Sequence, residues 1–305
     1  MQGDVFKIYR AIGQRIYNLN NVRERRRYYV FLVRCLTNCS RINILWEYFH
    51  STQLLKEIQQ LNPFVYEQPT RAFFYTKSTF DERSEIVRNH IGFLVDKLKQ
   101  KPLLDIYKGN DFSLWNGIEI NGKKLCASLH YNFGQRKEGM LSVMLWLDAA
   151  ALYQIIFWIA PDKGGDWSMW IGAMQGPNME DAKDVIKKVT KHCHSYRTKN
   201  LILYIAQALA RGLDLRHIYA VTNDGYYANN HVRMDRKLKT SFSDFWLEAG
   251  GNHTEDVRFD ELPLVEKRKS MEEVPVRKRA VYRKRFSLLD EIDASILESI
   301  SVIRV

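Results

Sequence analysis

The chain has 305 residues, a length that fits one large domain or two smaller ones. Hydrophobic residues make up 46% of it and charged residues 27%, which excludes a wholly disordered, collagen-like or coiled-coil chain. Its 46 lysine and arginine residues outnumber its 35 acidic residues and give a net charge of +11. That excess favours an anionic partner, such as a phosphate-bearing ligand, nucleic acid or an acidic membrane face.

Neither the cysteines nor the histidines predict a metal site. Cys35 and Cys39 lie four residues apart, and no Cys-x-x-Cys pair occurs. His192 and His194 lie two residues apart, so on a helix they point in different directions. The first residues hold no apolar run and do not predict a secretory signal. We expect free thiols and a cytoplasmic location, with peripheral attachment to the inner membrane as the alternative.

Residues 1–100 predict a helical region. One apolar stripe at helical spacing consists of Tyr29, Leu32, Val33 and Leu36. Thr79 and Glu82 form a capping-box pattern, which predicts the start of another helix. The cluster expected to form a solvated helix face is Arg23, Arg25, Arg26 and Arg27.

Residues 101–260 predict an α+β core. Asn121-Gly122 is a hairpin signal between two apolar runs. Three strand-length apolar segments follow at 141–147, 152–160 and 167–174, with short links between them. Consecutive strands with tight turns predict an antiparallel meander.

The apolar stretch 139–161 is long enough to cross a bilayer. Asp148 lies near its middle, where a charge inside a membrane would be expensive. Two strands joined by a turn at Asp148-Ala149 explain the stretch better, so we expect no transmembrane segment.

Residues 178–222 predict two helices and a strand. Asn178 is expected to cap the first helix, and residues 194–197 to break it. The second helix is expected to stop at Gly212, before a short buried strand at 218–221. The predicted fold class is α+β, with an N-terminal helical region and an antiparallel, mixed sheet flanked by helices.

Residues 261–305 predict a basic segment followed by an amphipathic helix. The apolar face of that helix is Leu289, Ile292, Ile296 and Ile300. The cations expected to bind nucleic acid or anionic lipid are Arg277, Lys278, Arg279, Arg283, Lys284 and Arg285. The alternative is a solvated helix that docks its apolar side onto the core.

The best candidate for a phosphate site lies where the second helix of 178–222 should begin. It offers two cations, a hydroxyl and an amide, on Arg197, Lys199, Thr198 and Asn200. Free N–H groups and the helix dipole attract anions at such a place, and coenzyme A would suit it. No GxxxxGK[ST] or GxGxxG motif occurs, and a capped, solvated helix start is the alternative.

Two loops beside the expected sheet could hold further site residues. Gln175 and Gly176 end the meander, where an amide and a close backbone approach could serve a ligand. Asn223, Tyr226 and Tyr227 follow the last strand, where a tyrosine could act as general acid and Asn223 could orient a carbonyl. Plain turns are the alternative at both places. No Gx[ST]xG or HExxH motif supports a serine hydrolase or a zinc protease.

Several stretches in order resemble the VirK/YbjX family, also described as the DUF535 domain of unknown function. They are Lys-Glu-Gly at 137–139, Ile-Gly-Ala-Met-Gln-Gly at 171–176, Tyr-Arg-Thr-Lys at 196–199, and the stretches 244–251, 261–263 and 277–285. Thr198 stands where the family usually has proline. The resemblance covers roughly residues 45–295. It implies a Gram-negative bacterial protein linked to virulence and to resistance against cationic antimicrobial peptides, without a settled activity.

The order of elements also resembles the GNAT acyltransferase plan. In that plan, backbone amides before a helix bind the coenzyme A pyrophosphate, and a tyrosine protonates the leaving thiolate. This chain lacks the [RQ]xxGx[GA] loop and has an additional helix before its basic loop. A related plan serves aminoacyl-tRNA-dependent transferases. Fold analogy does not fix function, so it supplies a hypothesis only.

The resulting hypothesis is acyl or aminoacyl transfer to an amine on a peptide or an envelope component. The donor would be acyl-coenzyme A or aminoacyl-tRNA, held at 197–200. Gln175 and Asn223 would orient the acyl carbonyl, Glu138 would be the base, and Tyr226 or Tyr227 the acid. Two alternatives remain: a non-enzymatic factor that binds anionic partners through its basic C-terminal surface, and a catalytically dead transferase scaffold.

Overall fold

A single sheet forms the centre of the molecule in a computed structural model that describes residues 2–230 and 241–305. Its strands are β1 (Phe112–Ile120), β2 (Lys123–His130), β3 (Leu141–Leu147), β4 (Ala150–Pro161), β5 (Trp167–Gln175), β6 (His217–Val221), β7 (Asn252–His253) and β8 (Phe259–Leu262). Among the described residues these eight strands pair in the order β1-β2-β3-β4-β5-β6-β8-β7.

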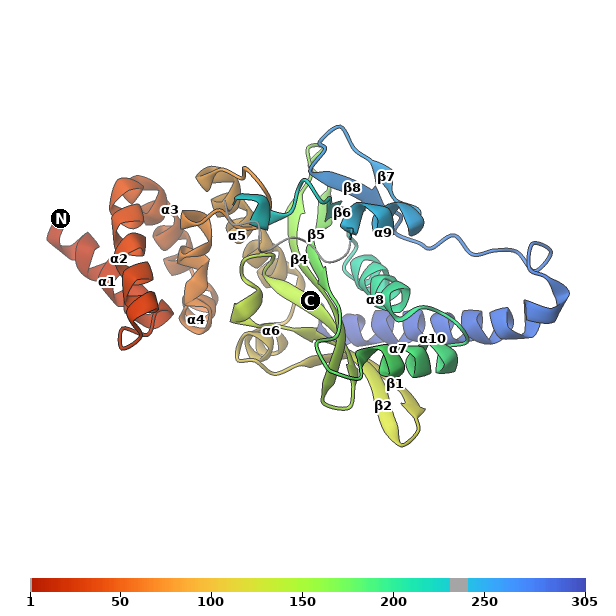
Figure 1. Cartoon of the computed structure of the whole chain (residues 1–305). Helices are drawn as coiled ribbons and strands as arrows, with labels where there is room; N and C mark the ends of the chain where they lie inside the picture. The colour runs from red at the N-terminus through yellow and green to blue at the C-terminus, as the bar shows by residue number, and fades with distance from the viewer. Residues whose placement is uncertain (1, 231–240) are drawn as a thin grey trace.

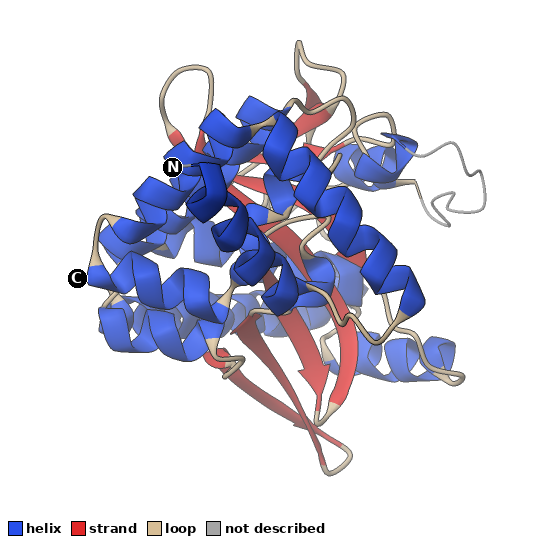
Figure 2. Ribbon diagram, turned by 90° about the vertical axis from the view of Figure 1, so that its left-hand side faces the viewer, coloured by secondary structure: helices blue, strands red, loops and turns tan. Residues whose placement is uncertain are grey.

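Helices cover the sheet from two sides. The first group is α1 (Gln2–Ile16), α2 (Val22–Thr37), α3 (Cys39–His50), α4 (Gln53–Leu61), α5 (Phe80–Lys97) and α6 (Gln100–Tyr107). The later helices are α7 (Ala182–His192), α8 (Thr198–Gly212), α9 (Phe242–Glu248) and α10 (Arg279–Ile303). In Figure 1 the sheet stands between α1–α5 on one side and α8 with α10 on the other, and Figure 2 shows the N-terminal helices in front of the strands. The predicted α+β class is confirmed.

The buried face of α2 differs from the predicted stripe. Tyr29, Val33 and Leu36 are at least half exposed, and Leu32 alone of the predicted four is buried. The buried side chains of the helix are Tyr28, Phe31, Leu32 and Cys35. The prediction was wrong because two apolar stripes share this helix, and α1 packs against the one that carries Tyr28 and Phe31. The arginine cluster at 23–27 is exposed, as predicted.

Helix α5 joins the helical region to the sheet. The predicted capping box is present, since Thr79 and Glu82 bond each other's backbone N–H groups. The helix lies on β4, where the buried His90 ring accepts a hydrogen bond from the Ile159 N–H over 3.0 Å. The apolar side chains Val87, Ile91 and Leu94 of the helix are buried.

The predicted meander is confirmed over β1–β5, which pair as consecutive antiparallel strands. Asn121 and Gly122 make the first turn with φ values of 53° and 77°. Asp148, with φ of 50°, turns the chain between β3 and β4, within the apolar stretch 139–161. No helix within 2–230 or 241–305 has the length and apolar character needed to span a bilayer.

Strand β6 lies parallel to β5, and α7 and α8 form the connection between them. The prediction that Asn178 caps α7 was wrong. The chain first makes a turn, in which the Ala182 N–H donates to the Met179 carbonyl over 3.3 Å. The helix then begins at Ala182, and Asp181 takes the N-cap position. Helix α8 ends at Gly212, as predicted.

Helix α10 packs against α8 and against β1, the edge strand of the sheet. Its buried side chains include the four predicted ones: Leu289, Ile292, Ile296 and Ile300. The hydroxyls of Ser295 and Ser299 donate hydrogen bonds to the Leu114 carbonyl of β1 over 3.4 and 3.1 Å. One buried cluster takes residues from all three predicted parts, 1–100, 101–260 and 261–305. The division of the chain at these boundaries stays a prediction.

Candidate functional site

Glu138 lies between the short helix η3 (Phe133–Gln135) and β3, in a loop laid against β5. Its backbone carbonyl occupies the space that a Cβ on Gly172 would need, so only glycine fits at 172 without a shift of backbone. The Phe74 N–H donates to the Lys137 carbonyl over 2.7 Å and holds the loop from its other side. The motif stretches 137–139 and 171–176 are therefore neighbours, and Glu138 is 6% exposed.

The Glu138 carboxylate accepts hydrogen bonds from two other elements. The Tyr226 hydroxyl donates to Oε1 over 2.8 Å, and the Gln175 amide donates to Oε2 over 2.7 Å. Burial raises the pKa of the Glu138 carboxyl, against the hydrogen bond from Tyr226, the charge of Lys137 and the hydrogen bond from Gln175. Burial, and next the Glu138 charge, raise the pKa of the Tyr226 hydroxyl. The site thus joins a carboxyl shifted toward its neutral form to a phenol that keeps its proton.

A row of amides fixes the orientation of Gln175. The Gln154 amide nitrogen of β4 donates to the Gln175 oxygen over 2.6 Å. Gln135 donates in turn to the Gln154 oxygen. Because the oxygens of Gln154 and Gln175 both accept, Gln175 presents its nitrogen to Glu138. Gly176 follows on the exposed surface beside the Tyr153 ring.

The site lies where two parallel strands part. The β5–β6 ladder ends at Ile171 and Ala220, while β5 continues to Gln175, which is paired with Gln154 of β4. The loop after β6 then carries Tyr226 to Glu138. That loop is held tightly, because a Cβ on Gly225 would collide with the Arg258 carbonyl.

Of the two predicted tyrosines, Tyr226 donates to the Glu138 carboxylate and Tyr227 packs beside it. The Tyr227 ring is buried, with its centroid 5.0 Å from that of Tyr226 and 6.3 Å from that of Phe73. The Asn223 amide donates to the Ser241 hydroxyl over 2.9 Å and accepts from the Phe242 N–H over 2.7 Å. Asn223 therefore holds the start of α9, and its predicted role in orienting a carbonyl stays a prediction.

Both cations of the predicted phosphate site contact α9. Arg197 hydrogen-bonds to one Glu248 oxygen, and Lys199 Nζ lies 3.5 Å from the other. These contacts, led by the hydrogen bond from Arg197, lower the pKa of Glu248. Lys199 Nζ also lies 4.4 Å from the centroid of the Phe245 ring. An anion would have to compete with Glu248 for both charges.

The remaining two residues at the start of α8 are more enclosed. Thr198 is 1% exposed, and its hydroxyl lies 3.4 Å from that of Thr190. The Asn200 side-chain oxygen is buried and has no hydrogen-bond partner. The two lie beside the cations, as the sequence predicts, but Thr198 offers no open surface to a ligand and Asn200 is only partly exposed.

The predicted C-terminal cations fall into two groups. Arg279 donates to the Val274 carbonyl, and Arg285 donates to the carbonyls of His194 and Ser195, so both support the fold. The other four lie in the first turns of α10 and in the short helix η6 (Val276–Lys278) that leads into it, and we call them the basic end of α10. All of them are exposed: Arg277, Lys278, Arg283 and Lys284.

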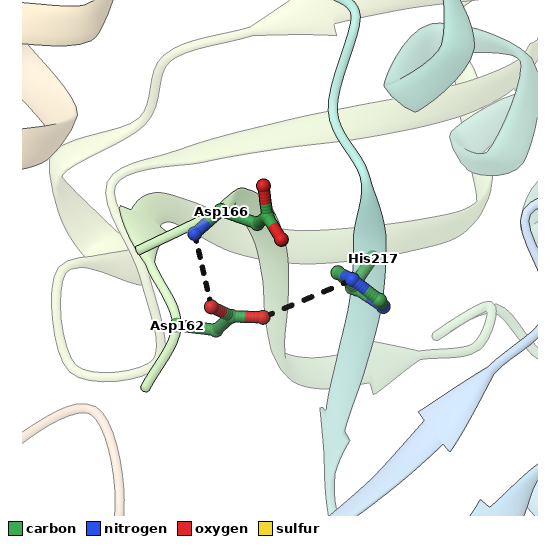
Figure 3. Close-up of side chains that lie close together, drawn as sticks. All are labelled: Asp162, Asp166 and His217. Atoms are coloured by element: carbon green, nitrogen blue, oxygen red, sulfur yellow. Dashed lines mark hydrogen bonds and ion pairs between the residues drawn. The ribbon is translucent and has the colours of Figure 1, made fainter. Parts of the chain in front are cut away.

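A metal-ligand constellation that sequence reasoning missed lies at the other end of β5 (Figure 3). Asp162, Asp166 and His217 place one ligand atom each within 4.8 Å of one another. Asp162 and Asp166 flank the β4–β5 turn, and His217 opens β6. The available signal was two aspartates around a glycine turn, with no pattern to bring the distant histidine to them. Gln135 and Gln154 were also missed, since single polar residues carry no motif. Glu248 lies in the motif stretch 244–251, but nothing in that stretch predicts its contact with Arg197.

Comparison with known proteins identifies one family model that matches the chain, over residues 20–298, described as "Protein of unknown function (DUF535)". The chain is 28% identical over 229 residues to the "Uncharacterized protein YbjX" of Escherichia coli K12, covering 68% of this chain and 69% of that protein. It is 26% identical to an uncharacterized Haemophilus influenzae protein, over 55% of each chain. A protein named "Membrane protein LapB", from Mannheimia haemolytica, is 25% identical over 55% of this chain and 73% of its own. No solved structure matches.

Proposed function

The chain belongs to the VirK/YbjX family (DUF535), and we propose that it transfers an acyl or aminoacyl group to an amine on a peptide or an envelope component. The observation that carries the proposal is the Glu138–Tyr226 pair, supported by Gln175, at the end of β5. Two titratable groups in contact, each with a raised pKa, are typical of sites that move protons.

The reaction would use these groups in sequence. The acceptor nitrogen attacks the acyl carbon, and its proton passes to the Glu138 carboxylate, whose raised pKa makes it a stronger base. The bond to the leaving group breaks, and the Tyr226 hydroxyl donates a proton to the departing sulfur or oxygen. The protonated Glu138 then returns a proton to Tyr226 across their 2.8 Å hydrogen bond, and the pair is restored.

The donor would lie on the α8 side of this site. Arg197 and Lys199 supply the positive charge for phosphate groups, once Glu248 has exchanged its two contacts for the ligand. Acyl-coenzyme A and aminoacyl-tRNA both carry such phosphates, so this corner supports either donor. The proton-transfer pair does not discriminate between them.

The test begins with native mass spectrometry of the purified full chain, mixed separately with acetyl-coenzyme A and with aminoacyl-tRNA. We expect a complex with one of the two. Single-turnover transfer to a peptide amine should then fall about 100-fold or more in Glu138→Gln and in Tyr226→Phe, the range for general acid–base groups. Tyr48→Phe is the matched control, because the Tyr48 hydroxyl donates to the Arg88 carbonyl in the helical region. Absence of any donor complex, or equal loss in Tyr226→Phe and Tyr48→Phe, would end the proposal.

A second candidate function rests on the basic end of α10. Four exposed cations there stand beside two arginines that fix the segment to the core, so the charge is presented on an ordered surface. This favours a non-enzymatic factor that binds nucleic acid or anionic lipid. A salt titration separates the two functions: affinity for nucleic acid should fall steeply with salt concentration, and affinity for a small ligand should fall less.

A further inference from the structure

A groove opens on the sheet at the end of β5 opposite to Glu138. Two adjoining hollows of about 400 and 300 Å³ share the residues Asp162, Lys163, Trp170, Asp256 and Phe259. Trp170 precedes Gln175 by five positions in β5, which corresponds to about 17 Å along a strand. The groove is thus a separate place from the candidate transfer site, and its volumes lie in the range of small-ligand pockets.

Aromatic rings form the floor of this groove. Trp158, Trp170 and Tyr219 occupy paired positions on β4, β5 and β6, so their side chains share one face of the sheet. The Trp158 and Trp170 rings lie 5° from parallel, and the Trp170 and Tyr219 centroids are 4.4 Å apart. Phe259 stands edge-on to Trp170 at 4.9 Å. Neither Trp170 nor Tyr219 is fully buried, so both offer ring surface to a ligand.

Carboxylates form the rim. The acids that line the two hollows are Glu82, Glu85, Asp162, Glu255, Asp256 and Glu261. The cations that line them are Lys163 and Arg258, and Arg258 is held by Asp256 through contacts of 2.8 and 2.6 Å. The rim is therefore acidic in a chain whose net charge is +11, which is the reverse of what an anionic ligand would need.

The Asp162 carboxylate, at one end of the groove, is already oriented by the fold (Figure 3). Its Oδ1 accepts from the N–H groups of Gly164 and Asp166 over 2.8 and 3.0 Å. Its Oδ2 accepts from the Tyr219 hydroxyl over 3.1 Å. The same oxygen lies 3.9 Å from Nε2 of His217, whose Nδ1 lies 2.7 Å from Glu261. Apart from this histidine, the contacts of Asp162 come from neutral donors, and they occupy oxygens that a metal ion would need as inner ligands.

We propose that this acid-rimmed aromatic groove binds a small organic cation, of the alkylguanidinium or alkylammonium type. The alkyl part of the cation would lie against the exposed surface of Trp170 and Tyr219, whose rings stack on each other. Asp162 and Glu261 would supply the opposite charge beside it. The proposal does not depend on the transfer reaction, because Glu138, Gln175 and Tyr226 do not line the groove.

The probes are n-butylguanidinium and the neutral n-butylurea, which has a similar shape, titrated into the full chain and followed by saturation-transfer NMR. We expect saturable binding of the cation at millimolar concentration and at least about tenfold weaker binding of the urea. Asp162→Asn combined with Glu261→Gln should weaken cation binding about tenfold. Glu255→Gln, an exposed rim variant away from the turn, keeps the test valid if the pair disturbs folding. Glu119→Gln, on the distant β1–β2 hairpin, removes one negative charge as Glu255→Gln does, and it should leave the affinity for the cation unchanged.

Three results would overturn the proposal. One is equal affinity for the cation and the urea, which would make the groove merely apolar. Another is unchanged cation binding in both the double variant and Glu255→Gln, or no saturable binding at all. The third is displacement of the cation by stoichiometric Mn²⁺, which would assign Asp162, Asp166 and His217 to a metal instead.

Discussion

Glu138 is buried by the loop that carries it, and this burial has a thermodynamic cost that depends on pH. The carboxyl has a raised pKa in the folded protein because it is removed from water, although Tyr226 and Gln175 hydrogen-bond its charged form. A group with a folded pKa above its unfolded value favours folding when it is protonated. Its contribution is therefore present below the unfolded pKa and disappears as the pH rises through the folded pKa.

We expect Glu138→Gln to remove this dependence, since glutamine keeps the shape and cannot ionise. The melting temperatures of the variant and the wild-type chain should be similar near pH 4. Between pH 4 and pH 8 the melting temperature of the variant should rise relative to that of the wild type, because only the wild type must hold a buried charge. Thermal melts across that range measure the difference. If the melting temperature of the wild type instead rose relative to that of the variant with rising pH, the two hydrogen bonds would outweigh burial in setting the pKa of Glu138.

At the scale of elements, α9 controls the charge at the start of α8. Glu248 is about half exposed and contacts both Arg197 and Lys199, so it neutralises part of the surface predicted to hold phosphate. The contacts lie near the surface, where such pairs have modest energies. A competing anion with several charges would therefore displace Glu248 at little cost.

Glu248→Gln should consequently tighten the binding of coenzyme A by about two- to fivefold, the range for one exposed ion pair. Arg197→Ala combined with Lys199→Ala should abolish it. Calorimetric titration of the full chain measures both effects, with the exposed Glu291→Gln of α10 as a control for charge. If Glu248→Gln bound more weakly, Glu248 itself would belong to the ligand site.

Much of the element plan follows from the sequence because local signals agree with the final packing. Asn121-Gly122 and Asp148 fix turns, and the Thr79 capping box starts a helix, whatever lies around them. Asn178 failed because a short turn competes with its capping role. The stripe of α2 failed because only the partner helix decides which apolar side is covered.

The candidate site was predictable only in part. Glu138, Gln175 and Tyr226 stand out individually in the sequence, but their contact spans separations of 37 and 88 residues. Topology creates such contacts and spacing does not encode them. For the same reason the sequence could not pair Glu248 with Arg197, or bring His217 to Asp162.

At the scale of the whole molecule, the net charge of +11 is not spread evenly. The basic end of α10 and the arginine cluster of α2 each present four exposed cations, while the aromatic groove is rimmed by acids. One chain therefore offers surfaces of both signs. Binding of a polyanion is expected at the first of these surfaces, where Arg279 and Arg285 add two cations beside the four exposed ones.

Replacing Arg277, Lys278, Arg283 and Lys284 with glutamine tests that expectation. The logarithm of the affinity for duplex DNA should fall less steeply with the logarithm of salt concentration, by about 0.9 for each phosphate that the variant no longer neutralises. Replacing Arg23, Arg25, Arg26 and Arg27 removes the same charge from α2 and serves as the matched control. Equal slopes for both quadruple variants would mean that net charge alone attracts the polyanion.

The two serines of α10 that hold the Leu114 carbonyl have a consequence for solubility. Their hydroxyls bond to β1, which is an edge strand of the sheet, and strands of separate molecules can pair with such an edge. Helix α10 thus covers an edge strand that could otherwise pair with another molecule. Loosening it would invite copies of the chain to stack edge to edge, so the last helix protects the protein from aggregation as well as completing its core.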